Sequence, residues 1–239
     1  ILSIALIVVL LIIIISYICF RIVFYVPRKN KQPSDELPVP SGKLYEPYHD
    51  MMRHWIKEAR SFEQEHFYIK SFDGLTLHAK YFEYEPGAIT EIMFHGYRGK
   101  AERDLCGGVQ RSFSLGHNVL IVDQRTAGHS EGKVITFGIC ERLDCLAWAE
   151  YLANRFGKDT TIILTGISMG AATVMMASVL PLPENVVGII ADCGYTSPGD
   201  ICKKVLKQWF NLPPFPIFYT AMLVVKLLPT KANLSTTSF

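Results

Sequence analysis

The sequence lacks a strong net charge, paired cysteines and internal repeats. Its 239 residues carry a net charge of only +2, which gives no electrostatic case for binding nucleic acid or an acidic partner. The six cysteines show no C-x-x-C pair, no zinc-ligand spacing and no small disulfide framework, so we expect free, mostly buried thiols. We therefore predict no metal, no cofactor and no nucleic-acid partner.

Charge is absent altogether from the first 20 residues. This stretch is long enough to cross a bilayer, since about 20 apolar residues span the hydrocarbon core. It is too long for the apolar region of a signal peptide, no small-residue cleavage site follows it, and every face is apolar, unlike a core helix. We predict a single-pass membrane anchor over residues 1–26 that enters the membrane through residues 1–20. The basic residues that follow favour a cytoplasmic domain by the positive-inside rule: Arg21, Arg28, Lys29 and Lys31.

The rest of the chain divides by composition. Residues 27–43 are rich in proline and charge, which predicts an extended linker. Residues 44–228 have the pattern of a globular domain, which begins with an amphipathic helix over residues 44–62. Residues 229–239 form a polar tail without a recognisable pattern.

Within the domain, strand patterns and helix patterns alternate. Two strands joined around Asp73-Gly74 predict a hairpin, because Asp-Gly is a strong turn signal. Single strands and helices then follow in turn. The predicted strands cover residues 66–71, 75–82, 89–95, 118–123, 160–165 and 186–191, and the helices cover 101–115, 139–156 and 171–180. This order predicts an α/β fold with a mostly parallel sheet, an antiparallel start and helices on both faces.

The segment Gly166-Ile167-Ser168-Met169-Gly170 lies between a predicted strand and a predicted helix. Strand, G-x-S-x-G and helix in this order are the context of a nucleophile elbow. The tight reversal forces the serine into a strained backbone conformation, and the two glycines relieve the crowding around it. Ser168 would then lie at a helix N-terminus, where free N–H groups can stabilise an oxyanion. A plain glycine-rich turn is the alternative interpretation.

Two further motifs precede this elbow, each at the end of a predicted strand: His95-Gly96-Tyr97-Arg98-Gly99 and Asp123-x-Arg125-x-x-Gly128-x-Ser130. With the three motifs in this order, residues 67–228 resemble the α/β-hydrolases. The resemblance is greatest to the membrane-anchored branch described as serine aminopeptidase-like or Bem46-like. It implies an α/β-hydrolase fold with strand order 1-2-4-3-5-6-7-8. It also implies hydrolysis of an ester, thioester or amide bond in a small-molecule ester, an acyl compound or a peptide.

The resemblance also implies roles for single residues. Ser168 matches the nucleophile, and the backbone N–H groups of Met169 and Tyr97 match the two halves of the oxyanion hole. His95 matches a structural position that shapes the oxyanion loop. The remaining polar residues of these motifs match positions that hold loops: Asp123, Arg125 and His129.

The chain departs from the family in its catalytic acid and base. The family places an acid after its seventh strand and a histidine after its eighth, whereas the predicted strands here stop at six. After Asp192 the sequence offers one aspartate, Asp200, no glutamate and no histidine. Asp192 itself comes one strand too early. We therefore expect a fragment of the hydrolase fold, with the acid and base beyond Phe239 and strand 186–191 left as an exposed apolar edge. An inactive membrane-anchored remnant or a binding module on the same scaffold is the alternative.

Two more helices are predicted after the sixth strand, over residues 200–210 and 217–228, separated by a proline-rich break. The second is strongly apolar but too short to span a bilayer. Three interpretations remain open: packing in the core, a wall of the acyl pocket, or insertion into the membrane beside the anchor. We favour the core or the pocket wall.

Overall fold

The computed structural model describes residues 2–27, 37–157 and 159–227. The predicted tail over residues 229–239 and most of the predicted linker, residues 28–36, lie outside them. In chain order the elements are α1 (Leu2–Val23), a 3-10 turn (Glu46–Tyr48), α2 (His49–Ser61), β1 (Glu65–Lys70), β2 (Thr76–Phe82), β3 (Thr90–Phe94), α3 (Ala101–Ser114), β4 (Asn118–Asp123), α4 (Glu141–Phe156), β5 (Ile162–Ile167), α5 (Met169–Ala177), β6 (Val186–Asp192), α6 (Pro198–Phe210) and α7 (Ile217–Leu227).

The strands form a six-stranded sheet in the order β1-β2-β4-β3-β5-β6. The first hairpin, β1 with β2, and the pair β2 with β4 are antiparallel. The pairs from β4 through β3 and β5 to β6 are parallel. This confirms the predicted fold class, including the antiparallel start, and the order agrees with the first six strands that the resemblance implies.

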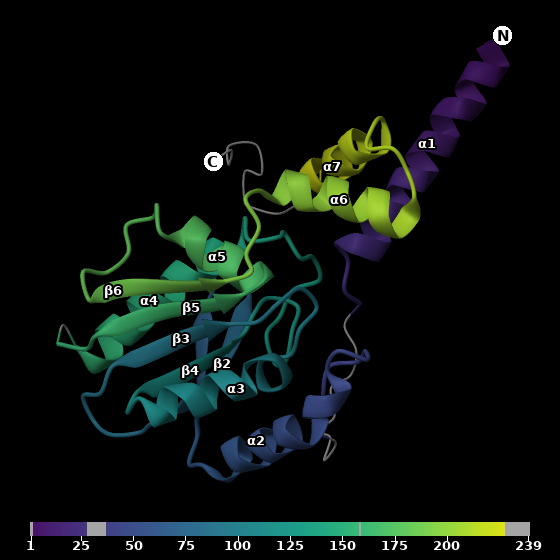
Figure 1. Cartoon of the computed structure of the whole chain (residues 1–239). Helices are drawn as coiled ribbons and strands as arrows, with labels where there is room; N and C mark the ends of the chain where they lie inside the picture. Colours follow the sequence, from purple (N-terminus) through teal and green to yellow (C-terminus); the bar gives the residue numbers. More distant parts are fainter. Residues whose placement is uncertain (1, 28–36, 158, 228–239) are drawn as a thin grey trace.

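Both faces of the sheet are covered by helices (Figure 1). Along β4, Leu120 and Val122 pack in the core beneath α4 and α5, while Val119 and Ile121 pack beneath α3. Alternate side chains of a strand point to opposite faces. Because both faces of β4 are buried, its sequence is a continuous apolar run rather than an alternating one.

The last strand, β6, is the edge of the described sheet and is only partly covered. Its Val187, Ile189 and Ile190 are exposed, as predicted for an apolar edge. The elbow strand also runs further than predicted: β5 ends at Ile167 rather than at residue 165. It continues because Gly166 and Ile167 still pair with β6, opposite Ala191 and Asp192.

Helix α1 leaves the sheet domain as a long rod (Figure 1). The stretch Leu6–Val23 is the one helix among the described residues that is long and apolar enough to cross a membrane. Most of its side chains are exposed, but Phe20, Val23 and Phe24 at its lower end are buried. There they pack against residues of α6 and α7 and against the loop before α4. The lower end of α1 is therefore part of the domain core.

Candidate active site

The turn between β5 and α5 has the geometry of a nucleophile elbow. Ser168 has φ 54° and ψ −111°, a conformation that L-residues rarely adopt. A Cβ on Gly166 would lie 2.2 Å from the carbonyl carbon of Gly170, and a Cβ on Gly170 would lie 2.0 Å from the carbonyl oxygen of Phe94. Only glycine fits at these two positions. The strained serine is thus held between two glycines that the packing requires.

The position of Ser168 in the fold suits attack on a carbonyl group. Its backbone N–H donates to the carbonyl of Asp192 at 2.8 Å, which ties the turn to the end of β6. Met169 begins α5 and is buried. The N–H groups of the first helical turn have no acceptor within the helix, so that of Met169 is free to stabilise negative charge beside Ser168.

The loop after β3 approaches the same turn. A Cβ on Gly96 would lie 3.6 Å from the Cβ of Ser168, so this loop passes at van der Waals distance from the serine. Tyr97 follows, and Tyr97 and Met169 belong to one apolar cluster. The structure thus brings together the three residues predicted for nucleophile and oxyanion hole, Ser168, Met169 and Tyr97.

His95 is fully enclosed and serves as a hydrogen-bonding pivot for this loop. Its Nε2 accepts from the backbone N–H of Gln124 at 3.2 Å, so Nδ1 carries the proton and donates to the carbonyl of Gly96 at 2.8 Å. This pattern requires the neutral ring. Burial lowers the pKa of His95, and the Gly96 carbonyl and Asp123 only partly offset it. The predicted structural position of His95 agrees with these contacts.

Gln124 was not among the predicted residues, although it lies inside the second motif. Its side-chain N–H group donates to the carbonyl of His95, and its Oε1 accepts from the hydroxyl of Thr173 at 3.5 Å. The single proton of the Thr173 hydroxyl is shared with the carbonyl of Met169, which is the nearer acceptor at 2.9 Å. Gln124 therefore connects the loop after β3 with the first turn of α5. The one signal in the sequence that could have identified Gln124 is its position directly after Asp123 in that motif.

Asp123 organises the loop after β4. Its carboxylate is bonded to His78 Nδ1 and to the backbone N–H of His129, both at 2.8 Å. A Cβ on Gly128 would lie 1.8 Å from this carboxylate, so the motif needs glycine there. Burial raises the pKa of Asp123, but the hydrogen bonds from His78 and His129 outweigh it and hold the pKa below its ordinary value.

Arg125 in the same loop forms a buried ion-pair network. Its guanidinium donates twice to Asp144 of α4, both at 2.7 Å, and reaches Asp73 of the first hairpin at 3.2 Å. Glu141, one turn before Asp144, accepts from the backbone N–H groups of Thr136 and Gly138. Asp123 and Arg125 thus hold loops, as the resemblance implied.

A cleft of about 840 Å³ opens beside these loops. Its lining includes Met169, the neighbour of Ser168, together with apolar residues and three basic side chains: Val26, Ile135, Arg98, Lys100 and His129. His129 is exposed on this surface. The acidic Glu131 also lines the cleft, which therefore lies next to the elbow and offers an apolar wall and side chains of both charges.

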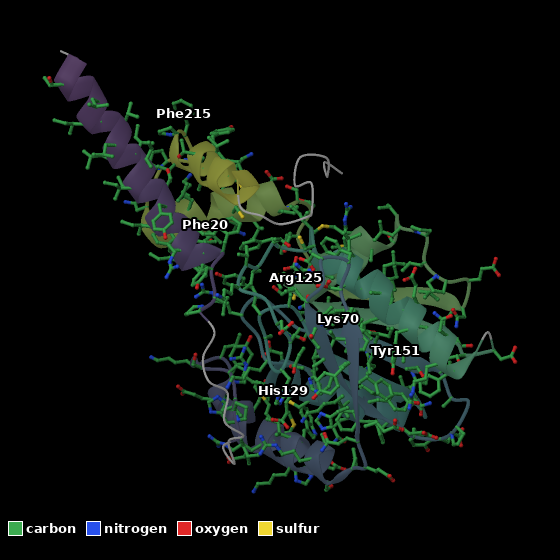
Figure 2. The ribbon with its side chains drawn as sticks, turned by 180° about the vertical axis from the view of Figure 1, so that it is seen from behind. Phe20, Lys70, Arg125, His129, Tyr151 and Phe215 are labelled. Carbon is green, nitrogen blue, oxygen red and sulfur yellow. The ribbon has the colours of Figure 1, made fainter. Side chains whose placement is uncertain are left out.

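The lower end of α1 and the residues after it form part of the site, which the sequence did not indicate. The Tyr97 hydroxyl donates to the carbonyl of Val23 at 2.6 Å, and the Arg98 guanidinium donates to that of Tyr25 at 3.1 Å. The rings of Phe24 and Tyr97 both pack on Phe137, with centroids 5.3 Å and 5.2 Å from it. Figure 2 labels Phe20 on the lower part of α1 and Arg125 in the adjoining part of the sheet domain.

A catalytic relay to Ser168 is not seen within residues 2–27, 37–157 and 159–227. The described histidines have other partners: His95 bonds to Gly96 and Gln124, His78 to Asp123 and His66, and His117 to Glu91. His49 bonds to the carbonyl of Pro40, His54 lies 3.9 Å from Glu58, and the exposed ring of His129 packs on that of His78. Asp192 is exposed at the end of β6. The expectation that the acid and base lie beyond Phe239 stays a prediction.

Comparisons with known proteins come from sequence and from structure. No family model matches the chain. The uncharacterized protein YqkD of Bacillus subtilis (strain 168) is 31% identical over 113 residues, which are 47% of this chain and 37% of YqkD. The chain therefore spans little more than a third of the length of this curated relative.

Two solved structures are similar over most of the domain. The Pyrococcus furiosus esterase Pf2001 has a TM-score of 0.57 and 24% identity, over 70% of this chain and 63% of the esterase. The α/β hydrolase GrgF from Penicillium sp. sh18 has a TM-score of 0.51 and 18% identity, over 63% and 53% of the two chains. Together with the strand order, these likenesses show that the chain has the α/β-hydrolase fold.

Proposed function

We propose that this chain is the elbow-bearing part of a membrane-anchored serine hydrolase of the serine aminopeptidase-like or Bem46-like branch. The observation that carries the proposal is the conformation of Ser168, with φ 54°, between two glycines that steric contacts require. Strain of this kind at a strand-to-helix turn is a feature of functional sites. A plain glycine-rich turn has no need of a positive φ at the residue that carries a side chain.

In the proposed reaction, Ser168 Oγ attacks the carbonyl carbon of an ester, thioester or amide. The bond from that carbon to the leaving group breaks after a tetrahedral intermediate has formed, and water then releases the acyl group. The backbone N–H groups of Met169 and Tyr97 donate to the oxyanion of the intermediate. The proton of Ser168 passes to a histidine oriented by an acid, which we predict beyond Phe239.

We further propose that α1 anchors the enzyme in a membrane and that the domain, residues 44–228, lies on the cytoplasmic side. The upper part of α1 exposes apolar side chains on every face, such as Leu6, Ile7 and Leu10. Burying these side chains in lipid removes them from water, whereas a water-soluble domain rarely exposes such a surface. The linker over residues 27–43 then joins the anchor to the first helix of the domain.

Labelling with a fluorophosphonate probe tests the enzymatic proposal. The probe reacts with an activated serine, so we expect labelling of the natural gene product in its membranes. Labelling should disappear in Ser168→Ala and persist in the matched control Ser178→Ala, because Ser178 is an exposed serine at the other end of α5. Absence of labelling at Ser168 in the natural product would instead favour a non-enzymatic binding module on the hydrolase scaffold.

A further inference from the structure

The two C-terminal helices, α6 and α7, pack against α1. The hydroxyls of Ser16 in α1 and Thr220 in α7 share a hydrogen bond, and Cys19, Leu206 and Ile217 form one buried cluster. Figure 2 shows Phe215, in the turn between α6 and α7, farther from the sheet than Phe20 of α1. The hairpin formed by α6 and α7 therefore lies beside the part of α1 that we place in the bilayer.

The depth of this contact follows from helix geometry. At about 1.5 Å per residue, Ser16 lies about 10 Å along α1 from Val23. Because Phe20 and Val23 pack in the domain core, the stretch that we place in the bilayer ends near Phe20, and the contact with Thr220 lies about 6 Å inside the hydrocarbon core. Thr220 suits this depth because its hydroxyl also donates to the carbonyl of Pro216 at 3.1 Å. Hydroxyls that are satisfied between helices are common in membrane interiors.

The hairpin exposes a set of large, mainly apolar side chains, with the polar Gln208 and Asn211 exposed among them. Four large side chains on it are more than half exposed: Trp209 at 62%, Phe215 at 74%, Tyr219 at 57% and Leu223 at 54%. The sequence carries no charge between Lys207 and Lys226. Three lysines precede this stretch on α6, Lys203, Lys204 and Lys207. A charge-free tip after a basic segment is the distribution expected for a hairpin that enters lipid beneath anionic headgroups.

The turn between the two helices is also suited to lipid. Irregular backbone is costly there because unpaired N–H groups find no water. Pro213, Pro214 and Pro216 carry no N–H at all. The N–H of Leu212 donates to the carbonyl of Leu206 at 3.3 Å, and that of Phe218 donates to the carbonyl of Pro214 at 2.7 Å. The prolines and these two hydrogen bonds reduce the number of N–H groups that need an acceptor in this turn.

We propose that the α6–α7 hairpin is embedded in the lipid bilayer beside α1, with acyl chains packed on Phe215, Tyr219 and Leu223. This inference rests on the proposed membrane anchoring by α1. Trp209 marks the headgroup level, where tryptophan is enriched. Its ring centroid lies 6.4 Å from that of Tyr97 on the loop beside Ser168. The embedded hairpin thus holds the candidate active site at the membrane surface, where an amphiphilic substrate would enter from the lipid.

Quenching of tryptophan emission by lipids with brominated acyl chains tests this proposal. The full chain is reconstituted in phosphatidylcholine vesicles, and Phe215→Trp is compared with its parent, both carrying Trp209→Phe. We expect the fluorescence of the tryptophan introduced at position 215 to be quenched in vesicles of brominated lipid and to be insensitive to acrylamide dissolved in the water. The matched control is Leu115→Trp, an exposed apolar residue at the end of α3. Its emission should respond to acrylamide alone.

Two results would overturn the embedded hairpin while leaving the anchor intact. Emission at position 215 that responds to acrylamide but not to brominated lipid places the hairpin in water. Emission that responds to neither quencher means that another protein, or a second copy of this chain, covers the face. Extraction with alkaline carbonate distinguishes a failed anchor, because release of the chain from the membrane would contradict anchoring by α1 as well.

Discussion

Gly166→Ala tests the steric basis of the elbow more directly than removal of the serine does. The added Cβ would lie 2.2 Å from both the carbonyl carbon and the carbonyl oxygen of Gly170. Non-bonded carbon atoms prefer a separation of about 3.5–4.0 Å, so the methyl group would be too close by more than about 1 Å. The atoms that it meets belong to the main chain and cannot rotate away. Relief requires the first turn of α5 to shift.

The magnitude follows from measured costs of overpacking. Extra methyl groups in a packed core cost about 1–3 kcal/mol and occasionally more, and we expect about 3 kcal/mol here because the clash is with backbone. For a protein of this size, about 1 kcal/mol lowers the thermal midpoint by about 2–4 °C, which gives a loss of about 6–12 °C. The shift of α5 should also displace the Met169 N–H and slow fluorophosphonate labelling of Ser168.

The matched control is Gly188→Ala in β6, where an added Cβ meets nothing within 4 Å. Neither Gly166 nor Gly188 has a positive φ, so the two substitutions differ in packing rather than in backbone conformation. We expect Gly188→Ala to change stability by less than about 1 kcal/mol, as at unstrained glycine sites. Thermal unfolding of the full chain in detergent measures both variants. Equal midpoints for the two would refute the steric account of the elbow.

Two further predictions concern buried polar groups. Arg125→Met leaves the carboxylates of Asp144 and Asp73 without their guanidinium, and breaking a buried ion pair in this way should cost about 3–5 kcal/mol of stability. In thermal unfolding, the double variant Arg125→Met/Asp144→Leu should recover much of that lost stability. No recovery in the double variant would contradict the pairing. Burial lowers the pKa of His95 below its ordinary value of about 6.5, so as the pH falls the unfolded chain takes up a proton before the folded one does. The contribution of His95 to stability should therefore be complete above about pH 6.5. Below that pH, stability should decline by up to about 1.4 kcal/mol per pH unit. Unfolding midpoints measured from pH 7 to 5 should decline less steeply in His95→Gln. The decline that remains in this variant is due partly to His66, whose pKa is also lowered by burial. An unchanged slope would contradict a neutral buried His95.

The sequence predicted those parts of the fold that local patterns determine. The apolar run over residues 118–123 predicted a strand, and the structure confirms it as β4, buried along its whole length. The spacing of glycines around Ser168 likewise predicted a strained turn, because the steric demand is local. Boundaries were less accurate where pairing with a neighbour decides them, as at Ile167, which stays in β5 opposite Asp192 of β6.

Long-range partners could not be predicted in the same way. Glu141 and Asp144 lie in the first turn of α4, where the helix dipole is an adequate explanation for acidic residues. The structure shows a more specific reason for each: Asp144 pairs with Arg125, and Glu141 holds the loop before the helix. The Arg125 partner is distant in sequence and reaches Asp144 only through the order of the strands. No periodicity or local motif signals such a contact.

The contacts of α1 could not be predicted either, and they change how the site is understood. The last carbonyl groups of a helix receive no hydrogen bond from within the helix, and they form the negative end of its dipole. In α1 these carbonyls receive the Tyr97 hydroxyl at Val23 and the Arg98 guanidinium at Ile22. Both donors belong to the loop that passes beside Ser168, and Arg98 itself has a positive φ of 51°. Removing α1 would leave both donors without these acceptors and uncover Phe137, so α1 supports the loop after β3 as well as serving as the proposed anchor.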